Sequence, residues 1–201
     1  MKRSIGVWKR IEGVMVSCLL FVFLTGCSEV QLQNGTNLQL EKDGGVTVTY
    51  IEDFASDYYD IDELEAMNRE EVNEYNQKAG SDVVEIIATE TDGSKITLTM
   101  HYVDVEDYGD MNGVPVYSGT VGQAVAMGYD LNKAFLDVKS GEKINEMNWK
   151  DLESSHVVIL NENCSVYPYQ KIEYVTDNVT VSEDRKMATV TGESQAVIVF
   201  K

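Results

Sequence analysis

Carboxylates are the commonest side chains in this sequence that could do chemistry. Four of them lie close together in one segment: Asp104, Glu106, Asp107 and Asp110. Carboxylate oxygens are ligands that Ca²⁺ prefers, and a pair of carboxylates is what most glycoside hydrolases need. A hydrolase would use Asp104 or Glu106 with a distant carboxylate, which the sequence alone does not pair.

The same acidic segment ends in Asn112-Gly113, the dipeptide found in many calcium-binding loops. Aligned on it, Tyr108 stands where the first aspartate of such a loop belongs and Gly119 where the final glutamate belongs, so the match fails. A looser site of oxygen ligands for a cation stays open, but we prefer the interpretation of a solvated acidic loop. We keep its four carboxylates as a candidate binding surface, and we predict no metal site and no cofactor.

Histidine, serine and lysine offer little further chemistry. His101 and His156 are the only histidines, and neither has a second histidine or cysteine at a metal-ligand spacing. Ser140-Gly141-Glu142-Lys143 matches the Ser-x-x-Lys motif of penicillin-recognising enzymes. However, the Lys-Ser-Gly motif overlaps it, whereas the enzymes need the two motifs far apart in the sequence. A turn between two strands explains this segment.

Tyr167 and Tyr169 form a second candidate contact surface. They flank Pro168, and proline favours a loop or a sheet edge, where aromatic side chains stay exposed. Exposed tyrosines can stack on sugars or peptides. Other tyrosines alternate along expected strands, which is typical of sheet packing.

The elements that position these residues indicate an α+β fold. Alternating residues predict a strand over 46–51, and Asp60 and Gly80 are suited to begin and end an amphipathic helix. Asp92-Gly93 predicts a hairpin between strands at 83–90 and 95–103, and Thr120 to Gly128 predicts a short helix. Further short strands are expected at 134–138, 157–160, 172–176, 179–181, 187–191 and 196–200. We therefore predict a mostly antiparallel sheet with one longer and one short helix.

The amino terminus has the organisation of a secretory signal. Lys2, Arg3, Lys9 and Arg10 form a basic region, and the run Val14–Leu24 that follows is apolar. A membrane-spanning helix needs about 20 apolar residues, so this shorter run is more typical of a signal peptide than of a permanent anchor.

Leu24-Thr25-Gly26-Cys27 follows the apolar run and resembles the lipobox of bacterial lipoproteins. The resemblance implies that the Cys27 thiol is alkylated with diacylglycerol and that a peptidase then cuts before Cys27. It therefore implies a protein on the extracytoplasmic face of the cell membrane, held there by acyl chains such as palmitate.

This resemblance divides the chain into a signal peptide (1–26), a lipidated amino terminus with a flexible tether (27–45) and a single α+β ectodomain (46–201). The tether is polar and has turn signals, although its weak alternation leaves an edge strand open. Because Cys18 leaves with the signal and Cys27 carries lipid, Cys164 has no disulfide partner. We expect Cys164 to be a small, semi-buried residue at a strand end.

The charge of the chain limits its partners. It has 34 acidic and 16 basic side chains, giving a formal net charge of −18. Loss of 1–26 removes four basic residues and one acidic residue, which leaves −21. Such a charge repels phosphate backbones and anionic headgroups, so we expect no nucleic acid partner and favour a cationic or neutral ligand or protein of the cell envelope.

Segments 119–130, 157–159 and 171–175 resemble those of small uncharacterised lipoproteins of Gram-positive bacteria, a resemblance that implies localisation but no activity. Two functions follow from the sequence. We favour a lipid-anchored protein with a non-catalytic acidic binding or assembly ectodomain. The alternative is a carboxylate-based envelope hydrolase.

Overall fold

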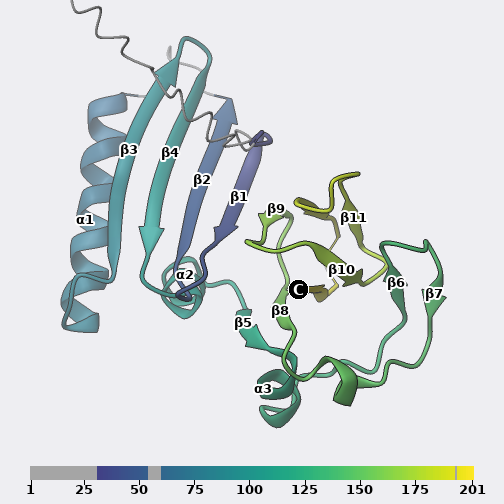
Figure 1. Ribbon diagram of the computed structural model, residues 1–201. Coiled ribbons are helices and arrows are strands. Elements are labelled where there is room, and N and C mark those ends of the chain that lie inside the picture. Colours follow the sequence, from purple (N-terminus) through teal and green to yellow (C-terminus); the bar gives the residue numbers. More distant parts are fainter. Residues whose placement is uncertain (1–30, 54–59, 193) are drawn as a thin grey trace, which may run out of the picture. The chain divides into compact units, whose positions relative to one another are not determined.

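Alternating β-branched and aromatic residues recur through the chain after residue 31, and the computed structural model accordingly contains two β-sheets (Figure 1). It describes residues 31–53, 60–192 and 194–201. The first sheet has the order β11-β12-β9-β1-β2-β4-β3 and the second has the order β5-β8-β13-β10-β6-β7. Of the strand pairs described, only β1 with β9 is parallel.

The strands of the first sheet are β1 (Gly35–Leu40), β2 (Val46–Asp53), β3 (Val84–Asp92), β4 (Lys95–Tyr102), β9 (Cys164–Tyr167), β11 (Val179–Val181) and β12 (Ala188–Val190). Those of the second sheet are β5 (Val116–Thr120), β6 (Phe135–Asp137), β7 (Lys143–Ile144), β8 (His156–Leu160), β10 (Ile172–Val175) and β13 (Ala196–Phe200). The helices are α1 (Ile61–Ala79), α2 (Val105–Asn112), α3 (Val121–Ala126) and the 3₁₀ helix η1 (Trp149–Leu152). The predicted α+β, mostly antiparallel fold is confirmed.

Local signals set the ends of the longest helix and of the hairpin. The Asp60 carboxylate accepts a hydrogen bond from the Asp62 amide at 2.9 Å, and Gly80, with φ of 76°, ends α1. Helix α1 lies beside β3 and buries Val72 (Figure 1). Strands β3 and β4 are joined by the two-residue turn Gly93-Ser94. These predictions of the sequence are confirmed.

The strands β8 and β13 of the second sheet are buried on both faces, which explains their uninterrupted apolar sequences. On one face, Val158 and Ile198 pack in a core shared with the first sheet. On the other face, Val157 and Val199 pack in a second core beneath α3 and η1. A strand with two buried faces cannot alternate between apolar and polar residues, so its sequence shows no period of two.

The expectation of a flexible tether over 27–45 is wrong for residues 35–40. They form β1, which lies inside the first sheet between β2 and β9 and is therefore not an edge strand either. Leu38 and Leu40 are buried in the shared core, so the weak alternation of this polar segment is the true signal of a strand. The folded body consequently begins before residue 46.

A buried asparagine fixes the start of β1. Asn37 is completely buried. Its side-chain Nδ2 donates to the carbonyl oxygens of Gln33, Gly35 and Thr49 at 2.7, 2.9 and 3.1 Å. Its Oδ1 accepts from the Gln33 amide at 2.8 Å and from the Tyr167 hydroxyl at 3.2 Å. One side chain therefore links β1 to β2, to β9 and to the segment that precedes it.

The prediction of an acidic loop after residue 103 is also wrong, because these residues fold as helix α2. The Asp104 carboxylate caps the helix by accepting from the Glu106 and Asp107 amides at 2.8 and 2.9 Å. Gly113, with φ of 66°, ends it. The fold thus has a third α-helix in addition to the one longer and one short helix that were expected.

Candidate functional site

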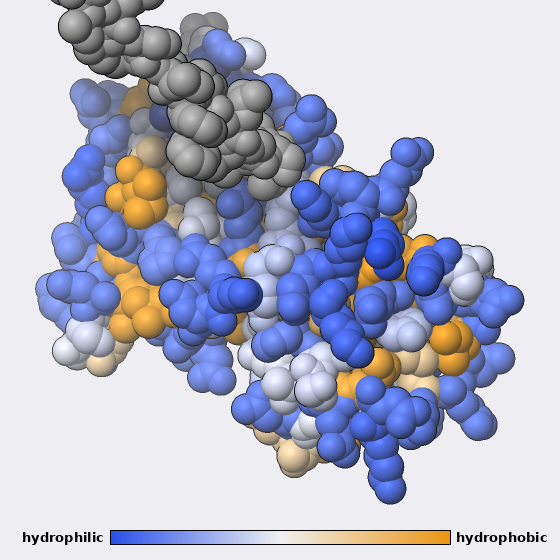
Figure 2. Space-filling view, viewed as in Figure 1, coloured by the Kyte–Doolittle hydropathy of each residue, from blue (hydrophilic) through white to orange (hydrophobic). Residues whose placement is uncertain are grey.

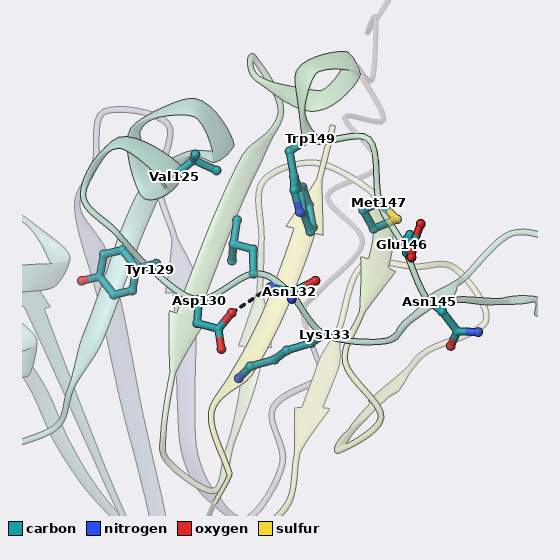
Figure 3. Close-up of a pocket in the computed structure, with 10 residues that line it drawn as sticks. Val125, Tyr129, Asp130, Asn132, Lys133, Asn145, Glu146, Met147 and Trp149 are labelled. Carbon is teal, nitrogen blue, oxygen red and sulfur yellow. Dashed lines mark hydrogen bonds between the residues drawn. The ribbon is translucent and has the colours of Figure 1, made fainter.

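A groove of about 310 Å³ lies between the carboxyl end of α3 and the segment that leads into η1 (Figure 3). We call it the α3 groove. It is lined by Val125, Tyr129, Asp130, Leu131, Asn132, Lys133, Asn145, Glu146, Met147 and Trp149. Three separate parts of the chain therefore contribute to it.

The predicted short helix, confirmed as α3, makes one side of the groove. Its first turn is held by a capping box in which the Gln123 amide donates to Thr120 Oγ1 at 3.2 Å and the Thr120 amide donates to Gln123 Oε1 at 3.0 Å. Gly128, with φ of 84°, turns the chain out of the helix, and the Tyr129 amide donates to the Ala124 carbonyl at 3.1 Å. The helix stays short, so the residues after it are free to line the groove.

Aromatic rings held by other aromatic rings supply the apolar part of the groove. The Trp149 ring meets Phe135 edge-on, with centroids 5.1 Å apart, and the Tyr129 ring lies 4.7 Å from that of Tyr117. Leu131 is buried in the same hydrophobic cluster against which Tyr129 and Trp149 pack. Rings fixed in this way can receive a ligand without losing side-chain freedom on binding.

The polar groups of the groove stand at its rim. The Asp130 carboxylate accepts from the Asn132 amide at 3.0 Å. Lys133 Nζ donates to Gln195 Oε1 at 2.9 Å and to the Gln195 carbonyl at 3.3 Å. Figure 3 shows Asp130 and Glu146 on opposite sides of the groove, with Asn132 between them, and their carboxylates do not point toward one another. A pair of carboxylates that acts on one bond must face that bond from both sides.

A second hollow of about 340 Å³, which we call the α2–α3 hollow, is lined by residues of α2 and α3 and by the strand between them. It is lined by Glu106, Tyr117, Ser118, Gln123, Ala126 and Met127. Glu106 is the only acidic residue among these, so this hollow brings no carboxylate pair together either.

The four acidic residues singled out in the sequence have different surroundings. Asp104 is occupied as the cap of α2, and the Tyr75 hydroxyl donates to Asp107 at 3.1 Å. Burial and the neighbouring Asp104 charge raise the pKa of Asp107. Glu106 lines the α2–α3 hollow, and Asp110 is exposed. Within the described residues, no three histidine, cysteine or acidic side chains come together as metal ligands would.

The expectation that Pro168 keeps its neighbours exposed is wrong for Tyr167. This side chain is only 8% exposed and its hydroxyl donates to Asn37. Tyr169 is half-buried, with its ring 5.4 Å from His156 and 5.3 Å from Phe200. Because β9 pairs with a strand on each side, the segment before Pro168 is not a sheet edge, and Tyr167 is unavailable for stacking on a ligand.

Several tyrosines instead form a network inside the shared core. Tyr108 is buried, and its hydroxyl donates to Glu162 Oε2 at 2.5 Å. Asn112 Nδ2 donates to the Tyr102 hydroxyl at 3.2 Å, and the Tyr50 hydroxyl donates to Asn112 Oδ1 at the same distance. Burial raises the pKa of all three tyrosines, so they remain neutral hydrogen-bonding groups.

Glu162 makes stability depend on pH. Burial raises the pKa of its carboxyl above the usual 4.5, and the Tyr108 hydrogen bond lowers it by less. A carboxyl with a higher pKa in the folded state costs stability as pH rises through that pKa. We expect Glu162→Gln, which keeps an acceptor for Tyr108, to flatten the fall in unfolding free energy between about pH 4.5 and 7, measured with urea. The control variant Glu70→Gln, at an exposed position of α1, should show the same pH dependence of the unfolding free energy as the parent protein. Equal slopes for the parent and Glu162→Gln would contradict a raised pKa.

The remaining candidates for chemistry are accounted for by packing. Cys164 is buried at the start of β9, and burial followed by the Glu162 charge raises the pKa of its thiol, so the predicted structural role at a strand end fits. His101 Nε2 lies 3.7 Å from Glu41 Oε2, and His156 stacks on Phe200. Gly141 turns the chain between β6 and β7, as expected for the Ser140 to Lys143 segment.

The α3 groove was not predicted, although the sequence contains parts of its signal. Gly128 after a capped helix marks a sharp turn, and Trp149 is the only tryptophan after residue 8. Nothing in the sequence pairs the two segments, because their proximity arises only from the packing of α3 and η1 over the second sheet.

The predicted lipidation site Cys27 lies outside the described residues. In the part of the chain that is described, no helix has the length and apolar character needed to span a membrane. No family model matches the chain, and neither does any curated protein or solved structure.

Proposed function

We propose that this protein is an extracytoplasmic lipoprotein, anchored through a lipid on Cys27, whose acidic ectodomain is a non-catalytic binding module. The α3 groove is its binding site. The ectodomain begins near residue 32, where a compact folded unit starts. The single observation that carries the proposed binding role is the α3 groove itself, with rigid aromatic walls and an exposed polar rim.

The anchor is supported by the order of features in the first 27 residues: a basic region, a short apolar run and Leu24-Thr25-Gly26-Cys27. Acyl chains are also an attachment that does not depend on the charge of this protein. Its large negative charge would oppose contact with an anionic membrane, so binding by surface electrostatics is disfavoured.

The binding role is supported by the composition of the groove. Ligand sites combine apolar and aromatic surface with a few polar groups that set orientation. In the α3 groove, the apolar and aromatic surface comes from Trp149, Tyr129 and Leu131, and the polar groups are those of Asp130 and Asn132. The carboxylates of the groove lie apart, which favours binding over hydrolysis by a carboxylate pair.

Trp149 offers a direct test, because it is the only tryptophan in a 28–201 fragment. We expect its fluorescence emission to change saturably with at least one of three probes: a basic hexapeptide, a neutral chitin oligosaccharide, or vesicles of zwitterionic lipid. Val125→Ser should weaken that binding by about fivefold, because it removes apolar contact area from the groove.

Val103→Ser is the matched control. Val103 and Val125 have nearly equal exposed fractions, 51% and 49%, but Val103 lies outside the groove. The control should bind like the parent fragment. An unchanged Trp149 emission with all three probes would contradict the proposed binding role, as would equal weakening by both valine substitutions.

A further inference from the structure

We propose that the α3 groove and the α2–α3 hollow together bind one cationic, partly apolar peptide segment of another protein. This inference rests on the proposed binding function and names the chemistry of the ligand.

The two hollows are adjacent parts of one surface around α3. Tyr117 lines the α2–α3 hollow and Tyr129 lines the α3 groove, and their rings are in contact with centroids 4.7 Å apart. The consecutive residues Val125, Ala126 and Met127 also divide between the two. The two hollows therefore share neighbouring residues of α3, so one bound peptide segment could contact both.

This surface carries part of the exposed apolar area of the molecule. Figure 2 shows a mainly hydrophilic face with separate small apolar patches. Among the described residues, five large hydrophobic side chains are exposed, and two of these, Val125 and Met127, lie at the end of α3, 49% and 61% exposed. Exposed apolar side chains rimmed by polar groups are typical of protein-binding sites.

The charge around the surface selects the sign of the ligand. Glu106, Asp130 and Glu146 line the two hollows, and Lys133 is the only basic residue among their lining residues. Lys133 is held by two hydrogen bonds to Gln195. The chain as a whole carries −18. Lysine or arginine side chains would therefore be attracted both at long range and at the rim, and the faces of Trp149 and Tyr129 also favour cations.

The same charges argue against an anionic lipid surface as the occupant. Asp130, Glu146 and Glu106 line the same two hollows as the exposed Val125 and Met127, and their negative charge would oppose an approach of anionic headgroups. A basic, partly apolar peptide can pair its charges with the carboxylates and also cover the exposed apolar side chains.

The test uses Trp149 emission of the 28–201 fragment and two capped hexapeptides. One has the sequence lysine-leucine-lysine-glycine-leucine-lysine, and its twin has glutamate in place of each lysine. We expect the basic peptide to bind at least about tenfold more tightly than its twin, and to weaken about threefold or more between about 50 and 300 mM salt. The double substitution Asp130→Asn and Glu146→Gln should lower the affinity for the basic peptide about fivefold. The control is the double substitution Glu70→Gln and Glu74→Gln, which removes the same charge from α1. It should change the affinity for the basic peptide by less than about twofold.

Met127→Gln tests whether the second hollow takes part. This substitution should lower the affinity for the basic peptide about threefold or more. Met67→Gln, at an α1 side chain with a nearly identical exposed fraction of 60%, should leave the affinity unchanged. Equal affinities for the Met127 and Met67 variants would overturn the two-hollow arrangement.

The outcomes separate this inference from the function it rests on. Equal binding of the two hexapeptides, or binding of the chitin oligosaccharide or of anionic vesicles in preference to the basic peptide, overturns the cationic-peptide inference while the groove remains a binding site. No change of Trp149 emission with any probe overturns both.

Discussion

Replacing Cys27 by alanine is expected to move the protein almost completely from the membrane fraction to the soluble fraction. Two or more acyl chains hold a protein durably, because each buried methylene contributes about 0.8 kcal/mol, and alanine cannot be alkylated. The acidic ectodomain offers no electrostatic substitute for them. Labelling of cells with a radioactive palmitate, followed by fractionation and immunoblotting, measures the attached lipid and the location together.

Cys18→Ala is the matched control, since it removes a cysteine from the same amino-terminal segment without touching Leu24-Thr25-Gly26-Cys27. This variant should keep both the label and the membrane location. A Cys27→Ala protein that is still processed and still sediments with membranes would exclude the proposed lipid anchor. The α3 groove would be unaffected by that result.

Asn37→Leu is expected to lower the free energy of unfolding by about 3 to 5 kcal/mol, measured with urea on the 28–201 fragment. The leucine side chain would remove the hydrogen bonds that the Asn37 amide makes to Gln33, Gly35, Thr49 and Tyr167. Each hydrogen bond inside the fold contributes about 0.5–1.5 kcal/mol to stability.

Gln39→Leu provides the control for that substitution, since Gln39 lies two residues along β1 and on the same face, where it is half-buried. We expect it to change stability by less than about 1 kcal/mol. Equal losses for the two variants would mean that any leucine on this face is harmful and that the Asn37 hydrogen bonds are not the cause.

Sequence patterns succeeded where the structure is set by neighbouring residues. Helix α1 has Asp60 and Gly80 at its ends, and the β3–β4 hairpin has its Asp-Gly turn, so each carries its own signal. Helix α2 carries one too: Val105 and Tyr108 are buried three residues apart between a capping Asp104 and Gly113. The density of carboxylates hid this pattern, because acidic residues favour both a surface loop and the first turn of a helix.

Features that depend on distant parts of the chain could not be predicted in the same way. Strand β1 is mostly polar, and its place inside the sheet depends on β9, which follows more than 120 residues later. The α3 groove likewise needs Tyr129 and Trp149 to meet across packed elements. Tyr167 seemed available beside a proline only because its partner Asn37 is so far away in the sequence.

Under the proposed anchoring through Cys27, the early start of β1 limits the distance between the folded body and the bilayer. Gly35 follows Cys27 by eight residues, and a fully extended stretch of that length spans only about 27 Å. A lipid on Cys27 would therefore keep the start of β1 within about that distance of the extracytoplasmic face of the membrane. The proposed anchor would thus connect to β1, which pairs with a strand on each side. The proposed lipoprotein would therefore be joined to its lipid by a short link that enters an interior strand of the first sheet.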